Sequence, residues 1–221
     1  MFNTKTKRYL VLLAAIGLVA AALGGTGTFA SFTAETTNAN NTFATGTLLL
    51  SNTVGTGSPC HSESNASNTA TCPAVFSASG LGTNHAETKT VTVSNTGTLS
   101  ASALTLKGST CVPSKVVTAG SLDQTGNLCS ALQISIEEDS AVGGSAVSCL
   151  VGSGPLSTCD PTAGPALDSW LAGTQTTALS LTGALAPATP HFYKISLYLG
   201  DVGNTYQGDQ ALFDLTWHLQ G

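Results

Sequence analysis

The chain has 221 residues, of which 42% are hydrophobic and only 9% are charged, with a formal net charge of −5 at pH 7. This length fits one domain of ordinary size. The acidic balance argues against a nucleic-acid partner, because phosphate recognition depends on arginine and on basic patches. The 24 glycines and many small polar residues favour short strands joined by turns.

The N-terminus has the pattern of an export signal. Lys5, Lys7 and Arg8 precede an apolar run over residues 10–23, as the basic and hydrophobic regions of a signal peptide do. The run is shorter than the roughly 20 apolar residues that a membrane-spanning helix needs. Residues 1–30 are therefore predicted to be a signal peptide, with an uncleaved membrane anchor as the alternative.

Small residues at Thr28 and Ala30 predict cleavage by signal peptidase between Ala30 and Ser31. The mature chain, residues 31–221, is then expected to be one secreted domain that no longer contacts the membrane. It would keep four lysines, no arginine and all twelve acidic residues, a formal charge of −8. Such a charge supports solubility more than it indicates a specific partner.

The first half of the mature chain alternates between strand and turn patterns. Polar and apolar residues alternate in the half-buried strands, as the period of two requires. The expected elements are a strand over 43–50, a loop over 52–73, a strand around Val91 and Val93, a turn at 95–97, a strand around Leu104 and Leu106, and a loop over 107–129.

The second half carries the clearest strand patterns. A segment at 167–173 fits one helical turn or a bulged edge. Polar residues 133, 135 and 137 are expected to point outward. The residues predicted to point inward are Leu132, Ile134 and Ile136, then Leu179 and Leu181, then Tyr193, Ile195, Leu197 and Leu199, and finally Ala211, Phe213, Leu215, Trp217 and Leu219.

These patterns together predict about seven to nine short strands and no long amphipathic helix. The economical packing is an all-β, antiparallel sandwich of jelly-roll-like or immunoglobulin-like architecture with long disulfide-bearing loops.

Six cysteines follow the expected cleavage site, and an even number outside the cytosol favours disulfides. Six cysteines allow 15 pairings, but their grouping along the chain favours pairing of neighbours. A zinc site is less favoured, because structural zinc sites prefer cysteines two to four residues apart. The favoured disulfides are Cys60–Cys72, Cys111–Cys129 and Cys149–Cys159.

No motif for a metal or a nucleophile is present. The histidines at 61, 85, 191 and 218 do not form His-Glu-x-x-His, and no Gly-x-Ser-x-Gly occurs. No cofactor is therefore expected. The weaker alternative is calcium, which binds oxygen ligands, at Glu137, Glu138 and Asp139 or at Asp201, Asn204 and Asp209; solvated turns are the simpler interpretation.

Several stretches resemble one known family. Gly27 to Ala30 are followed by Asn41, Thr42 and Phe43 and then by Gly46, Thr47 and Leu48, and two further similar stretches lie at 93–106 and 203–221. The sequence thus resembles the TasA/camelysin family, whose precursors are cleaved by a SipW-type signal peptidase. The resemblance implies an exported jelly-roll protein that assembles into fibres of a biofilm matrix or cell surface.

The resemblance also implies that the segment after the cleavage site inserts as a strand into a neighbouring subunit. Residues 31–41 are polar and poor in helix formers, so their backbone groups need a sheet edge. A flexible tail or a strand within the same subunit are the alternatives. The predicted assembly strand is Ser31, Phe32, Thr33, Ala34, Glu35, Thr36 and Thr37, within a donor segment that extends to residue 41.

The sequence therefore predicts a secreted, non-enzymatic structural protein that associates with itself into fibres. One alternative is a secreted metal-dependent endopeptidase, as camelysin is classed, although no residue set here matches a zinc motif. The other is a carbohydrate-binding or surface-binding module that uses exposed Trp170, Tyr198 and Tyr206 as its platform.

Overall fold

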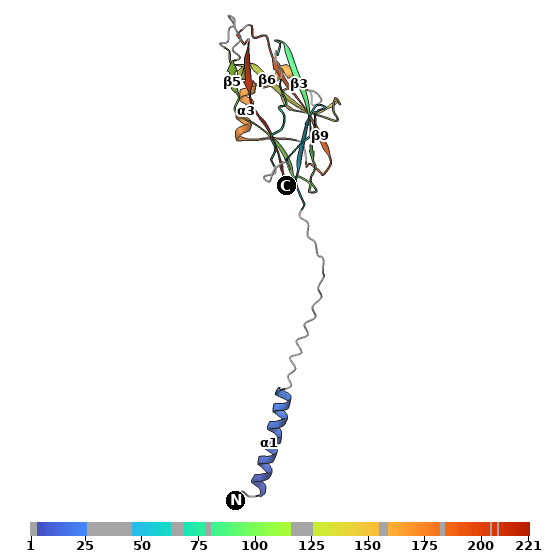
Figure 1. Cartoon of the computed structure of the whole chain (residues 1–221), viewed down its shortest axis with the longest axis vertical. Helices are drawn as coiled ribbons and strands as arrows, with labels where there is room; N and C mark the ends of the chain where they lie inside the picture. The colour runs from blue at the N-terminus through green and yellow to red at the C-terminus, as the bar shows by residue number, and fades with distance from the viewer. Residues whose placement is uncertain are drawn as a thin grey trace. The chain divides into compact units, whose positions relative to one another are not determined.

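The computed structural model describes residues 4–25, 46–62, 69–77, 81–115, 126–154, 159–181, 184–203, 205–206 and 208–221. The chain divides into two compact units, Met1–Ala44 and Thr45–Gly221. The first contains helix α1 (Thr4–Gly25), and the second contains all the strands (Figure 1). Within the described segments, no helix combines the length and the apolar character needed to cross a membrane.

The larger sheet has six antiparallel strands, and β3 and β9 at its centre pair over ten residues. Its order across the sheet is β2 (Cys60–His61), β1 (Leu50–Val54), β3 (His85–Asn95), β9 (Pro190–Leu199), β6 (Leu132–Asp139) and β7 (Ala146–Val151).

The smaller sheet has three antiparallel strands, and a two-stranded ribbon continues from it. The order in the sheet is β11 (Leu215–Gln220), β4 (Ala103–Gly108) and β8 (Leu179–Ser180), and the ribbon joins β10 (Asp209–Leu212) to β5 (Val112–Lys115). Three short helices complete the unit: α2 (Leu128–Ala131), the 3-10 helix η2 (Pro161–Ala163) and α3 (Leu167–Thr176).

The predicted all-β sandwich is confirmed. The two sheets bury their apolar faces against each other, and both central valines of β3 and both central leucines of β4 are fully buried. In β10 and β11 the predicted alternation holds residue by residue, with every odd-numbered residue from 211 to 219 less exposed than its neighbours. The described residues form eleven strands, more than the predicted seven to nine. Strands β2 and β5 lie within segments predicted as loops, and the predicted strand over 211–219 is divided between β10 and β11.

Three local predictions differ from the structure. The predicted loop over 107–129 contains β5, which pairs with β10. Residues 46–49 are not a strand, and β1 begins at Leu50, so it occupies the first residues of the predicted 52–73 loop. Residues 167–173 belong to a ten-residue helix rather than to a single turn or a bulged edge. Leu167, Trp170, Leu171 and Thr174 are buried on one face of α3, the spacing of an amphipathic helix.

Candidate functional site

The predicted cleavage site, Ala30 and Ser31, and the predicted assembly strand over residues 31–37 lie outside the described residues. The described sandwich begins at Gly46 and hydrogen bonds at once to the loop after β3: Thr47 O accepts from Thr98 N at 2.8 Å and from Leu99 N at 3.0 Å. The Leu48 side chain lies against Gly221. The chain therefore enters the sandwich beside its own C-terminus (Figure 1).

One sheet edge at this end is regular and open. Strand β11 pairs in unbroken register with β4, from Leu215 opposite Gly108 to Gln220 opposite Ala103. In the described part of the chain, no strand pairs with the other side of β11. An edge of this kind presents unpaired backbone groups to any incoming strand.

The direction of these backbone groups follows from β4. The Leu104 carbonyl accepts from Leu181 N at 3.0 Å, so Leu104 directs its backbone toward β8. Backbone groups alternate along a strand, so Thr105 and its neighbours of the same parity bond to β11. The β11 residues opposite them are Thr216, His218 and Gln220, and those whose backbone N–H and C=O face the open edge are therefore Leu215, Trp217 and Leu219.

Strand β7, the outer strand of the larger sheet beside β6, is irregular. Its pairing with β6 shifts register twice, between Ile136 and Glu137 and between Glu138 and Asp139. Such bulges bend an edge and interrupt its ladder. Cys149 within β7 is also bonded to Cys159, which ties the following loop to this edge.

Three disulfides occur, and they join the pairs that the sequence favours. Their Cα–Cα distances are 5.7 Å for Cys60–Cys72, 5.9 Å for Cys111–Cys129 and 5.1 Å for Cys149–Cys159. The first disulfide joins β2 to the loop that follows it, and the second joins the start of β5 to α2. The third joins β7 to the segment that leads into η2.

Cys159 and the segment that follows it, through η2 to Gly164, cover one part of the outer sheet face. Gly164, just after η2, packs so closely on β6 that an added Cβ would lie 2.0 Å from the Ile134 carbonyl oxygen. Beneath this cover Ser135 is 3% exposed and Glu137 is 1% exposed. The prediction that Ser135 and Glu137 point to solvent is therefore wrong, although both do lie on the face opposite Ile134 and Ile136.

Glu137 has two partners under this cover. The backbone N–H of Cys159 donates to Glu137 Oε2 at 2.8 Å. Lys194 lies directly opposite on β9 and pairs through Nζ with Oε1. The disulfide loop and β9 thus hold the two carboxylate oxygens from different sides.

Asp139 lies two residues further along the same face and is 4% exposed. Among the described residues, its Oδ1 has no hydrogen-bond partner. Burial raises the pKa of the Asp139 carboxyl above its usual range. The interpretation of residues 137–139 as a solvated turn is wrong, because Glu138 is buried as well.

Glu138 points to the inner face of the sheet. Its Oε1 lies 2.7 Å from His191 Nδ1. His191 stacks on Tyr193 with ring centroids 6.4 Å apart, and Tyr193 contacts Trp217 of the other sheet at 5.4 Å. Burial, and then the charge of Glu138, raise the pKa of Tyr193 far above its usual range.

The sequence could have indicated this contact. His191 has the same parity as Tyr193, Ile195, Leu197 and Leu199, so it belongs to the inward set of β9. Only the pairing of β9 with β6, which sequence does not reveal, places Glu138 beside it.

The other candidate ligands are dispersed. His85 and His218 are exposed, and Asp209 pairs with Lys115 at 2.9 Å. Asn204 lies outside the described residues. Over the segments that the structure describes, no three His, Cys, Asp or Glu side chains gather as a metal site would require.

The predicted aromatic platform does not form as expected. Trp170 is buried in α3 at 9% exposure, which corrects its assignment as an exposed platform residue. Tyr206 packs over Gly126, and Tyr198 Oη donates to Asn84 Oδ1 at 3.1 Å. These three aromatic side chains therefore pack in the core or contact neighbouring residues.

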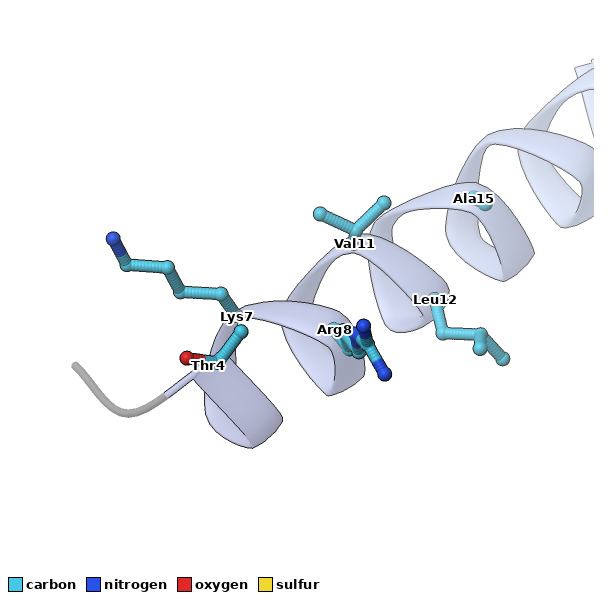
Figure 2. Close-up of a pocket in the computed structure, with 6 residues that line it drawn as sticks. All are labelled: Thr4, Lys7, Arg8, Val11, Leu12 and Ala15. Atoms are coloured by element: carbon cyan, nitrogen blue, oxygen red, sulfur yellow. The ribbon is translucent and has the colours of Figure 1, made fainter.

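Helix α1 has one shallow hollow (Figure 2). Six residues of this single helix line it: Thr4, Lys7, Arg8, Val11, Leu12 and Ala15. Val11 and Leu12 are largely exposed. Since one helix surface forms the whole lining, we assign no ligand to it.

Two comparisons with known proteins were negative. The sequence matches no model of a protein family, and a search of curated proteins finds no match either. The function is therefore argued from the edges and side chains described above.

Proposed function

We propose that this protein is a secreted structural subunit of a bacterial extracellular matrix or cell surface, and that it forms fibres by strand exchange. In this proposal the donor segment, residues 31–41 of one copy, pairs with the open edge of β11 in the next copy. The observation that supports the proposal most is the regular, unbulged β11 edge beside the point where the described sandwich begins.

The donor segment is chemically suited to such an edge. Strand addition obtains its affinity from backbone hydrogen bonds and its specificity from alternate side chains. In the sequence, Phe32 and Ala34 alternate with the more polar Thr33 and Glu35. An added strand with this pattern would place its apolar side chains on the inner face, which Trp217 already occupies.

The edge offers a matching set of partners. Three of its residues direct their backbone groups outward, and each has its side chain turned toward the core. A donor strand would therefore extend the smaller sheet without disturbing the β4 ladder. The residues in this set are Leu215, Trp217 and Leu219.

Secretion is part of the proposal. Three disulfides are typical of proteins that fold outside the reducing cytosol. The sequence before residue 31 has the pattern of an export signal. A signal peptidase would release residue 31 as the new N-terminus and so free the donor segment.

The test uses the exported protein. N-terminal sequencing should give Ser31, and negative-stain microscopy should show filaments that are absent when residues 31–41 are deleted. A synthetic peptide of residues 31–41, added in excess, should stop filament growth, whereas a peptide of the same composition in scrambled order should not. Monodisperse monomers from the intact mature chain, measured by light scattering, would overturn the proposal.

A further inference from the structure

The covered pair of Lys194 and Glu137 has no part in the proposed strand exchange. It lies on the outer face of the larger sheet, away from β11. Lys194 on β9 and Glu137 on β6 face each other directly across the ladder. Cross-strand partners of this kind have their Cβ atoms about 4.5–5.5 Å apart, which a lysine and a glutamate side chain span easily.

The surroundings of this pair are unusual for a surface ion pair. Only 1% of the Glu137 side-chain surface is exposed, against 35% for Lys194. Glu137 Oε1 meets Lys194 Nζ and accepts no hydrogen bond of regular geometry, while Cys159 N–H holds Oε2 at 2.8 Å. The carboxyl carbon is therefore fixed in front of the amine.

A second carboxyl group, that of Asp139, follows on the same face of β6. Asp139 leaves the same face of β6 two residues later, is buried, and has an oxygen without a hydrogen-bond partner. Burial raises the pKa of the Asp139 carboxyl above its usual range, which is the direction that a proton-transfer group requires. No other described group hydrogen bonds to this Oδ1.

We propose that Lys194 and Glu137 join in an intramolecular amide bond, formed by the folded protein itself with Asp139 as the proton-transfer residue. This would make the site a covalent cross-link between β6 and β9. The proposal does not depend on fibre assembly.

The reaction balances without any co-reactant. Within the ion pair, a proton passes from the Lys194 ammonium to the Glu137 carboxylate and leaves a neutral amine and a neutral acid. The lone pair of Nζ attacks Cδ of Glu137, and a Cδ–Nζ bond forms. One Cδ–O bond breaks, its oxygen leaves as water with the help of a proton from Asp139, and Asp139 regains a proton from the nitrogen.

Two physical effects favour this outcome over a persistent ion pair. Burial penalises the charge of the Glu137 carboxylate, whose side chain is 1% exposed, and so favours transfer of a proton to it. Fixed neighbours react with effective molarities of about 10⁵ to 10⁸ M, and the sandwich fixes these two atoms before reaction. Water leaves through the exposed side of Lys194.

Intact mass spectrometry of the reduced and denatured protein tests the proposal. The protein should be lighter than its sequence by one water molecule. The variant Lys194→Met should have its full sequence mass, since methionine keeps the side-chain length and lacks the amine. Lys89→Met is the matched control: Lys89 pairs with the more exposed Glu87 on the same sheet, so this variant should still lose water.

Trypsin gives a second measurement that locates the bond. The last lysines are Lys115 and Lys194, with no arginine after Arg8. A blocked Lys194 would leave residues 116–221 as one looped peptide, whereas a free Lys194 would yield two peptides, 116–194 and 195–221. Asp139→Asn should restore the two peptides in most molecules of a protein that still unfolds cooperatively.

Some results would overturn the proposal. The proposal is wrong if the protein unfolds cooperatively, has its full sequence mass and is cut by trypsin after Lys194. A water loss that persists in Lys194→Met would place the dehydration elsewhere.

Discussion

Two of the outer strands, β7 of the larger sheet and β11 of the smaller sheet, differ in the regularity of their pairing. Strand β7 departs from regular pairing twice, contains a disulfide cysteine and is followed by a loop that folds over its own sheet. Strand β11 pairs without a shift and keeps three backbone groups turned outward. Because open edges invite association, this difference indicates that one edge is protected and the other is kept available.

The largest effect is expected from a proline placed on each edge. Proline has no N–H, so it cannot donate to an incoming strand. Leu219→Pro removes an outward N–H of β11 and should abolish filaments seen by microscopy. Val147→Pro, at the irregular and exposed edge of β7, should leave filament number and length unchanged.

A control must show that the two proline variants are still folded, so that a loss of filaments reports on assembly alone. Leu219→Val keeps the N–H and should still form filaments, and thermal unfolding should show that all three variants are folded. Filaments from a folded Leu219→Pro protein would assign the acceptor edge elsewhere.

A smaller effect should follow from disturbing the cover beside β7. Gly164→Ala would bring a Cβ to 2.0 Å from the Ile134 carbonyl oxygen, so the loop over Glu137 must move. We expect the free energy of unfolding, measured in denaturant, to fall by about 1–3 kcal/mol, as in other overpacked sites.

Gly173→Ala is its matched control. Gly173 lies inside α3, and an added Cβ would meet nothing within 4 Å. Alanine is a better helix former, so this variant should gain about 0.5–1 kcal/mol. If both substitutions changed the free energy of unfolding equally, Gly164 would not be in close contact with β6.

The smallest effect concerns the ribbon that precedes β11. Lys115 Nζ lies 2.9 Å from Asp209 Oδ1 and donates to Gly126 O, and the Asp209 side chain is 2% exposed. Lys115→Met should lower the free energy of unfolding by only about 0.5 kcal/mol, because the lysine side chain is 37% exposed and solvent screens the pair.

The double variant Lys115→Met with Asp209→Asn should recover part of that loss, since the charge is then gone. No recovery in chemical unfolding would show that the lysine stem, rather than its charge, stabilises the ribbon.

Sequence periodicity predicted the core well where strands alternate. Tyr193 and Trp217 were assigned inward from the period of two, and both are buried. The same rule assigned Glu137 outward, and it failed because the cover comes from a loop over 20 residues further along the chain. The alternation of a strand predicts which face of the sheet a side chain lies on. It does not predict whether another segment of the chain covers that face.

The contacts of the candidate site were also only partly predictable from the sequence. Neighbouring cysteines gave the favoured disulfides because short loops bring their ends together readily. The pairing of Glu138 with His191 and of Glu137 with Lys194 depends on the register between β6 and β9. Glu138 and His191 are 53 residues apart in the sequence. How two such distant strands align depends on the packing of the whole sandwich, and the sequence pattern does not reveal it.

The contact between Leu48 and Gly221 also determines how the protein can be labelled. A fluorescent domain or an affinity tag fused after Gly221 would crowd the place where the chain enters the sandwich. The turn at Gly55, at the far end of β1, is exposed and an added Cβ there would meet nothing within 4 Å. A small reporter inserted in that turn would leave the entry point and the β11 edge clear, so the proposed filaments could be imaged without blocking either.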